Sequence, residues 1–364
     1  MNLCANMITA PTEHRDRAWV EVDLDALVDN GRSIAGYTSA RLLPMVKANG
    51  YGLGAIPVAR ALTPLDPWGF GVATAAEGGE LRAAGVSRPI VVFTPFGPPW
   101  REQFERYDLR PAIGDLDALR AWLPTGRPFH VEVDTGMGRA GFRAADAAQL
   151  ETLRTLVRDA AGLEGIFTHF HSADSDPEAV RRQWEGLQGV VGSLPRRPEF
   201  VHAANSAASC LVPEYAGDLA RPGIYLYGGT EGGLSPCPVA RLRARVVAVR
   251  RLTPGDTVSY GATFVAAHAT TVATLGIGYA DGVLRALSGR GRVELRDHVY
   301  RIAGRVTMDL TVIDAGNDEV RVGDIATVWG GKVGLEEQAA AAGTVSYELL
   351  TAIGARVPRL YREE

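Results

Sequence analysis

The sequence lacks the features of a secreted, membrane-spanning or nucleic-acid-binding protein. It has only three cysteines, Cys4, Cys210 and Cys237, which form no close pair and show no metal-ligand spacing. No apolar run approaches the length of a membrane span, and no basic segment followed by an apolar one opens the chain. The formal net charge of −4 gives no electrostatic reason to expect a nucleic acid or an anionic membrane as partner. These absences are typical of a protein of the reducing cytoplasm.

What the sequence does contain is an ordinary globular composition. Hydrophobic residues make up 46% and charged residues 22%, which argues against long disordered segments. Residues 1–16 are polar, carry Pro11 and are predicted to form a loose tail. The 364 residues are enough for one large domain and a smaller one.

Between residues 17 and 234, short apolar runs alternate with stretches of helical spacing. The runs cover residues 44–50, 68–74, 89–96, 109–115, 128–136, 163–170, 199–206 and 220–228. Several of the stretches between them end at glycine, which commonly stops a helix. Eight strands alternating with helices predict an α/β domain of the (β/α)8 TIM-barrel type. Pro111 interrupts the fourth run, so a doubly wound open sheet is the alternative.

The pattern changes after residue 234, and residues 235–364 are predicted to form a mainly β domain. Alternating, β-rich runs follow one another there without regular helices between them. They cover residues 240–252, 256–266, 270–280, 291–297, 305–314 and 324–330. A helical stretch around residues 335–354 closes this domain.

Function in a (β/α)8 barrel collects at the carboxyl ends of the strands. Those ends carry a polar, varied set that includes three cations: Lys47, Asp134, Arg139, His169, Asn205, Ser206, Arg221, Gly223 and Ile224. Lys47 directly follows an apolar run that is predicted to be a buried strand. A lysine in such a place shifts its pKa readily, which suits Schiff-base chemistry and proton abstraction. Ser206 and residues 221–224 follow strands seven and eight, where barrels often bind phosphate. A pyridoxal phosphate enzyme needs such a lysine and phosphate pocket.

Simpler interpretations of the same residues remain open at this point. A strand-end lysine can merely extend to solvent, and Tyr260 can be an aromatic residue that packs a strand. His169 and His171 alternate along one strand, but no clear carboxylate or thiolate completes a metal shell, so no metal is predicted. Arg139 can be a surface ion-pair residue, although two neighbouring glycines are more consistent with a shaped pocket.

Eight motifs in both predicted domains resemble those of alanine racemase, in order and in spacing. They are MVKANGYGLG (45–54), VDTGMGRAGF (133–142), THF (168–170), HAANSAA (202–208), RPGIYLYG (221–228), VSYGATF (258–264), IGYADG (277–282) and RVTMDL (305–310). No single motif is decisive, but eight in register make a chance match improbable.

The resemblance implies a racemase, an isomerase that interconverts L- and D-alanine with pyridoxal 5'-phosphate. Lys47 would hold the cofactor and act as one base, and Tyr260 of a partner subunit would be the opposite base in a homodimer with shared active sites. The D-alanine would serve bacterial cell-wall supply. The other implied cofactor residues are Tyr51, Ser206, Gly223, Ile224 and Tyr347 at the phosphate, Arg221 at the pyridine nitrogen, and His169 and Asn205. The implied substrate residues are Arg139 and the backbone around Met308 at the carboxylate, with Tyr279 and Asp309 at the entrance.

General chemistry agrees with these implied roles. Racemisation removes a proton from one face of Cα and supplies one to the other, so two bases are simpler than one that must move. His169 and Arg221 lie on neighbouring strand ends, where we predict a hydrogen-bonded relay that stabilises the tyrosinate. An arginine at the pyridine nitrogen leaves that nitrogen unprotonated, which favours racemisation over transamination or elimination. A barrel-type decarboxylase is disfavoured because such enzymes are expected to place a carboxylate, and not an arginine, at the pyridine nitrogen of the cofactor.

Three positions depart from the family pattern. Glu132 stands where the family commonly has a lysine that becomes carbamylated, and we predict that Glu132 holds Arg139 directly or through a water or ion. Leu53 replaces a usual histidine, and Thr307 replaces a common cysteine. These departures leave room for a racemase of broader specificity, for example towards serine. A non-catalytic pyridoxal phosphate-binding protein is a further alternative, although such proteins resemble only the first domain.

Overall fold

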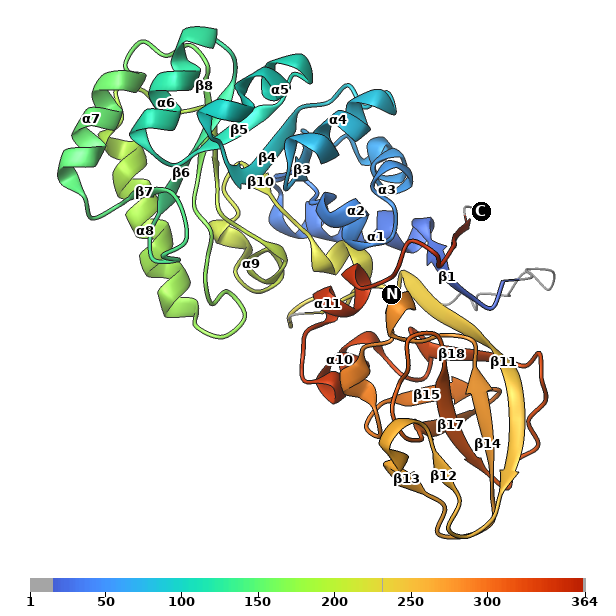
Figure 1. Ribbon diagram of the computed structural model, residues 1–364. Coiled ribbons are helices and arrows are strands. Elements are labelled where there is room, and N and C mark those ends of the chain that lie inside the picture. Colours follow the sequence, from blue (N-terminus) through green and yellow to red (C-terminus); the bar gives the residue numbers. More distant parts are fainter. Residues whose placement is uncertain (1–15, 231, 363–364) are drawn as a thin grey trace.

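Short parallel strands form a ring at the centre of the first domain in the computed structural model, which describes residues 16–230 and 232–362 (Figure 1). Seven of these strands overlap the predicted runs, while β2 begins three residues before the first run. The predicted tail lies outside the described residues except for Asp16. The ring strands are β2 (Arg41–Leu42), β3 (Phe70–Val72), β4 (Ile90–Pro95), β5 (Arg110–Ile113), β6 (Phe129–Asp134), β8 (Leu163–Phe167), β9 (Phe200–His202) and β10 (Leu219–Ala220).

Backbone hydrogen bonds close this ring. Strands β3, β4, β5, β6, β8 and β9 form one parallel sheet in that order, and β10 pairs with β2. On one side of the β10–β2 pair, Met45 bridges to Gly71 in parallel. On the other side, the Arg221 N–H donates to the Ala204 carbonyl at 2.9 Å. The prediction of a (β/α)8 barrel over an open sheet is therefore confirmed.

Helices cover the outside of the ring, and most of them begin at a side chain that accepts a backbone N–H. Thr74 and Glu77 form a complete capping box at the start of α4. No helix within residues 16–230 and 232–362 is long and apolar enough to cross a membrane. The helices are α1 (Leu24–Thr38), α2 (Lys47–Tyr51), α3 (Ala55–Leu62), α4 (Ala75–Ala83), α5 (Arg101–Arg106), α6 (Leu116–Trp122), α7 (Ala147–Val157), α8 (Pro177–Ser193) and α9 (Ser206–Leu211).

The second domain is built on a closed antiparallel barrel. Strand β11 (Ala240–Leu252) buries alternate residues over its first half and is long enough to pair with β18 and then with β14. The remaining barrel strands are β14 (Thr270–Leu275), β15 (Arg292–Leu295), β16 (His298–Ile302), β17 (Thr311–Gly316) and β18 (Ile325–Trp329). The predicted closing helical stretch is present as α10 (Leu335–Ala342) and α11 (Ser346–Thr351).

The structure differs from the sequence interpretation at three places. Strand β1 (Ala18–Asp23) lies within the part assigned to the first domain, yet it pairs with β11 and with β19 (Arg359–Arg362) of the second sheet. Strand β16 was not predicted, because its HVYRI sequence is short and mostly exposed. The run 305–314 becomes a strand only from Thr311, since residues before it form a loop.

Candidate active site

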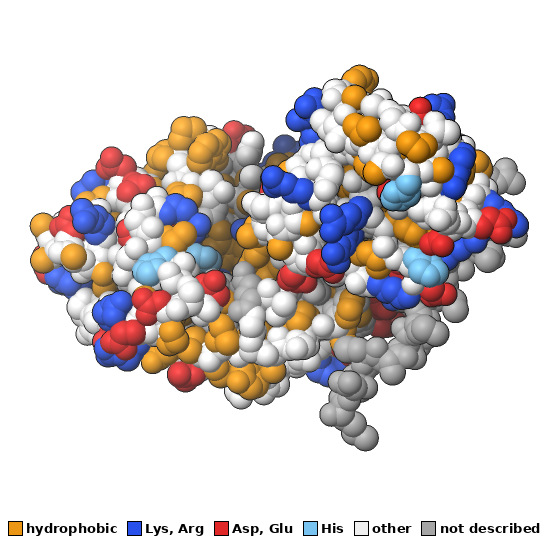
Figure 2. Space-filling view, turned by 90° about the horizontal axis from the view of Figure 1, so that it is seen from below, with side chains coloured by type: hydrophobic (Ala, Val, Ile, Leu, Met, Phe, Trp, Pro, Cys, Tyr) orange, Lys and Arg blue, Asp and Glu red, His pale blue; other side chains and the backbone are white. Residues whose placement is uncertain are grey.

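A cavity opens at the carboxyl ends of the barrel strands. Figure 2 shows the surface hollowed between the two halves of the molecule, with hydrophobic side chains in the hollow. The predicted residues that line the cavity are Lys47, Tyr51, Glu132, Arg139, His169, Asn205, Ser206, Arg221, Gly223, Ile224 and Tyr347. Met45, Phe93 and Phe167 line it as well and were not predicted. Tyr347 comes from α11, so the second domain closes one wall.

The residues after Lys47, which make up the rest of α2, form a left-handed turn and not a right-handed helix. Their φ angles are 53° at Ala48, 53° at Asn49, 60° at Gly50 and 52° at Tyr51. This conformation costs roughly 1–2 kcal/mol for each residue that carries a Cβ, so surrounding contacts must hold it. The Glu77 carboxylate accepts the Ala48 N–H at 2.6 Å, and the Asn49 side chain accepts the Ala55 N–H at 3.0 Å. Glu77, which sequence reasoning missed, thus fixes the backbone next to Lys47.

Lys47 lies in an environment that makes its proton easier to remove. Its side chain is half-buried in the cavity wall. Burial lowers the pKa of the amine, and Arg139 and Arg221 lower it further, while Glu77 opposes the shift. The shift favours a neutral amine, which is the form that acts as a nucleophile or as a base.

Arg221 is buried at the base of the cavity and its guanidinium is almost fully satisfied. Nη2 donates to the carbonyls of Thr168 and Ala203, both at 2.8 Å, and Nη1 lies 2.8 Å from His202 Nδ1. The charge also lies over the Phe167 ring, 5.4 Å from its centroid. Burial lowers the pKa of Arg221 to about 9, so the group still carries its proton at neutral pH.

His169 lies next to Arg221, as the predicted relay requires. Its Nδ1 is 3.4 Å from Arg221 Nη2. Burial lowers the pKa of His169 to about 3, and the nearby cations Arg221, Arg139 and Lys47 add to the effect. The imidazole is therefore neutral at physiological pH.

Ser206 and Gly223 form a small cradle beneath Tyr51. The Ser206 hydroxyl accepts the N–H groups of Gly223 at 2.8 Å and Tyr225 at 3.3 Å, which leaves its own O–H to donate to an anion. A Cβ on Gly223 would lie 2.2 Å from the Tyr51 hydroxyl oxygen, so only glycine permits this approach. Tyr51 in turn stacks on Tyr227, with ring centroids 4.5 Å apart. The donors present fit a phosphate ester.

Glu132 and Arg139 both line the cavity but form no direct ion pair in the part of the chain that the structure describes. Glu132 is buried, and its Oε2 atom has no hydrogen-bond partner. Burial raises the pKa of this carboxyl, although Arg139 and Arg221 oppose the shift. Arg139 is exposed at the cavity mouth and is available to an anionic ligand.

Four predicted residues lie outside this cavity, on the second domain. Tyr260 and Met308 are 73% and 53% exposed, and Tyr279 is exposed too. Asp309 accepts from Arg356 Nη2 at 2.6 Å. Tyr260 stands in the turn between β12 (Thr257–Val258) and β13 (Phe264–Val265), which Figure 1 shows at the end of the second domain remote from the first. One chain therefore does not bring Tyr260 to Lys47.

The other two departures from the family pattern have local structural roles. Leu53 is fully buried in the main hydrophobic cluster. The Thr307 hydroxyl donates to the Leu310 carbonyl at 2.9 Å and accepts the Leu310 N–H at 3.2 Å, which closes the loop that presents Met308.

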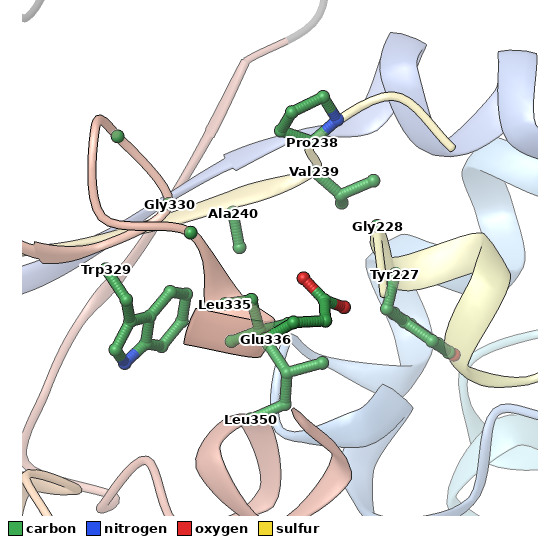
Figure 3. Close-up of a pocket in the computed structure, with 12 residues that line it drawn as sticks. Tyr227, Gly228, Pro238, Val239, Ala240, Trp329, Gly330, Leu335, Glu336 and Leu350 are labelled. Atoms are coloured by element: carbon green, nitrogen blue, oxygen red, sulfur yellow. The ribbon is translucent and has the colours of Figure 1, made fainter. Parts of the chain in front are cut away.

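A second pocket lies between Tyr227 of the first domain and Trp329, Leu335 and Leu350 of the second (Figure 3). Most of its lining residues have apolar side chains or are glycines, and the one carboxylate, Glu336, already accepts the Thr230 N–H at 2.9 Å. The lining holds no lysine, arginine, histidine or cysteine. This pocket therefore offers no amine, imidazole, thiol or guanidinium, whereas the cavity around Lys47 offers an amine, an imidazole and two guanidinium groups.

Comparison with known proteins identifies the family. The alanine racemase N-terminal domain family matches residues 22–231, and the alanine racemase C-terminal domain family matches residues 239–361. The chain belongs to the alanine racemase family. Alanine racemase from Desulforamulus reducens is 35% identical, over 95% of this chain and 99% of that protein. Alanine racemase from Symbiobacterium thermophilum is 38% identical, over 95% of this chain and 97% of its own length.

Solved structures agree with this assignment. Alanine racemase from Streptomyces lavendulae has a TM-score of 0.89 at 34% identity and covers 97% of this chain and 98% of its own. The enzyme from Bartonella henselae, solved with covalently bound pyridoxal phosphate, has a TM-score of 0.90 at 29% identity and covers 96% of this chain and 100% of its own. The predicted family, enzyme class and cofactor, a pyridoxal phosphate-dependent racemase, are thereby confirmed.

Proposed function

We propose that this chain interconverts L- and D-alanine by a two-base mechanism, with Lys47 on one face of the substrate and Tyr260 of a partner subunit on the other. The observation that carries the proposal is the placement of Lys47. Its amine has a lowered pKa and shares one cavity with a phosphate-type cradle and two cations. We also propose that the enzyme works in the cytoplasm.

The cavity residues would hold pyridoxal 5'-phosphate. Ser206, Tyr51 and Tyr347, with the backbone of Gly223 and Ile224, would bind the phosphate, and Asn205 would support them by capping α9, where its side chain accepts the Ala208 N–H. Arg221 would donate to the pyridine nitrogen. When bound, this cofactor withdraws electrons and so acidifies the substrate α-hydrogen.

The amino-acid substrate would be oriented by its carboxylate. Arg139 at the cavity mouth supplies a free guanidinium, which suits a bidentate contact with a carboxylate. The backbone around the partner's Met308 would add a second contact, and the partner's Tyr279 and Asp309 would line the entrance. Lys47 Nζ then accepts or returns the proton on its face of Cα, and Tyr260 Oη does so on the opposite face.

The proposed homodimer follows from the exposure of Tyr260, Met308 and Tyr279. These large side chains lie exposed on one domain, which is typical of a surface that another copy covers. Ser259 and Ala262, with φ of 64° and 47°, hold Tyr260 in a strained turn. Such strain persists where surrounding structure or function requires it.

Mixed dimers test the sharing of sites. A Lys47→Ala subunit combined with a Tyr260→Phe subunit forms one site that lacks both bases and one that has both. Random mixing should therefore restore about a quarter of wild-type activity in a two-fold symmetric dimer. Each variant alone, subjected to the same unfolding and remixing, is the control. Failure to restore activity in dimers shown by mass spectrometry to be mixed would contradict shared sites.

Glu132 is proposed to orient Arg139 through a bridging water or ion, since no direct pair joins them. The Glu132→Gln variant removes the charge and keeps the shape, so KM for alanine should rise about 10-fold, while kcat changes less. Initial rates with L- and D-alanine measure both constants. Exposed Glu151, which pairs with Arg154, gives the matched Glu151→Gln control. An unchanged KM would remove the proposal.

The activity itself is tested by proton NMR in D2O with the cofactor-loaded protein. L-Alanine should lose its α-proton signal, and chiral analysis should detect D-alanine. The same assay with serine and longer amino acids measures the breadth of the substrate range. No exchange with any of these substrates would contradict the proposed activity.

A further inference from the structure

Two buried histidines connect Arg221 to a carboxylate at the opposite end of the barrel. His202 Nδ1 lies 2.8 Å from Arg221 Nη1, and His202 Nε2 lies 2.9 Å from His130 Nδ1. His130 Nε2 lies 3.3 Å from Glu164 Oε2. Glu164 stands at the beginning of β8, away from the carboxyl end that carries the cavity. A continuous side-chain path therefore runs through the barrel interior.

The neighbouring strands make room for this path. His130 on β6 is opposite Gly165 on β8, and a Cβ on Gly165 would lie 2.3 Å from His130 Nδ1. Phe167, also on β8, stacks on His202 with ring centroids 5.0 Å apart. Both imidazoles are fully buried. The rings are thus fixed by packing, and each ring nitrogen in the path has one defined neighbour.

The direction of every hydrogen bond in the path follows from its two ends. Arginine only donates, so His202 Nδ1 must accept and its proton must be on Nε2. That N–H donates to His130 Nδ1, which places the His130 proton on Nε2, where it donates to the Glu164 carboxylate. Burial lowers the pKa of both histidines, so each carries a single ring proton.

We infer that Glu164 is a positioning residue for Arg221. As the terminal acceptor of the path, Glu164 fixes the tautomers of His130 and His202. It thereby keeps His202 Nδ1 unprotonated, so that this atom can accept from Arg221 Nη1. Without the Glu164 acceptor, the His130 Nε2–H would be a buried donor with no partner. The opposite tautomers avoid this cost, but they turn a His202 N–H towards Arg221, so that two donors face each other. The inference rests on the proposed placement of Arg221 at the pyridine nitrogen. The Thr168 and Ala203 carbonyls would still hold Nη2, but Nη1 would lose its acceptor, so the guanidinium would turn away from the orientation that this contact needs.

A purely structural role for Glu164 is the competing explanation, because Glu164 also pairs with Arg110 at 3.4 Å. Nitrogen-15 NMR of protein with 15N-labelled histidine separates the positioning role from the structural one, because the chemical shifts of the ring nitrogens report which nitrogen carries the proton. In the wild type, His130 and His202 should each have a protonated Nε2 and an unprotonated Nδ1. A proton on Nδ1 of either ring overturns the inference without any variant.

Two substitutions then test the acceptor. Glu164→Leu removes it, so the His130 and His202 signals should change to mixed tautomers, and kcat should fall about 10-fold with little change in KM. Glu164→Gln keeps an oxygen acceptor, so the wild-type tautomers and most of kcat should remain. Glu151→Gln, on the exposed face of α7, is the control.

Unchanged tautomers in Glu164→Leu would overturn the inference even if activity fell, and so would mixed tautomers in Glu164→Gln. The NMR readout needs no turnover. Failure of the racemase proposal is therefore distinguishable, because it would leave the tautomer pattern intact while the D2O exchange assay showed no activity.

Discussion

Replacing Lys47 by alanine is expected to lower alanine racemisation by about 10⁴-fold, the upper range for removing a positioned acid–base group. The same change removes the amine proposed to hold the cofactor covalently. Racemisation is measured by chiral analysis of the product. Covalent attachment is measured separately, by borohydride reduction of the cofactor-loaded protein and peptide mass spectrometry.

The scarcity of lysine makes this experiment unusually clear. The chain has two lysines, Lys47 and Lys332. Lys332 is exposed and donates to the Asp297 carbonyl at 2.7 Å, so Lys332→Ala is the matched control and should retain full activity and labelling. Reduced cofactor on the Lys47 peptide is expected in the wild type and in the control. A label on Lys332, or on neither lysine, would contradict the assignment of Lys47.

Replacing Tyr260 by phenylalanine is expected to lower racemisation by about 10³-fold, because one face of Cα loses its proton donor and acceptor. Binding of the cofactor should be unchanged, since Tyr260 lies outside the cavity that would hold it. Exchange of the α-proton with D2O should persist for one alanine enantiomer and nearly disappear for the other. NMR measured separately from each enantiomer gives both exchange rates.

Tyr37→Phe is the control for loss of a tyrosine hydroxyl, because Tyr37 is also exposed, on helix α1. It should exchange both enantiomers at the wild-type rate. Equal and unimpaired exchange from both faces in Tyr260→Phe would rule out the two-base assignment and leave Lys47 as the only base.

Some site residues were predictable because strand polarity fixes their position. In a parallel barrel all carboxyl ends meet at one rim, so Lys47, His169, Ser206 and Arg221 meet although they are far apart in sequence. His130 was not singled out from the sequence, although it stands two residues before Glu132 on β6 and so shares a face of that strand with it. Strand alternation gives that face, but it does not give the partner of His130.

The sequence by itself determined the barrel, the second β domain and the family, and it singled out Lys47 as the candidate lysine, because these depend on local periodicity and on motifs in a fixed order. Only the tertiary structure decided which sheet receives β1, that Tyr260 is remote from Lys47 in its own chain, and that Glu164 meets His130. The reason is physical: local patterns fix which face of an element is buried, whereas strand pairing and side-chain contacts depend on packing between segments far apart in the chain.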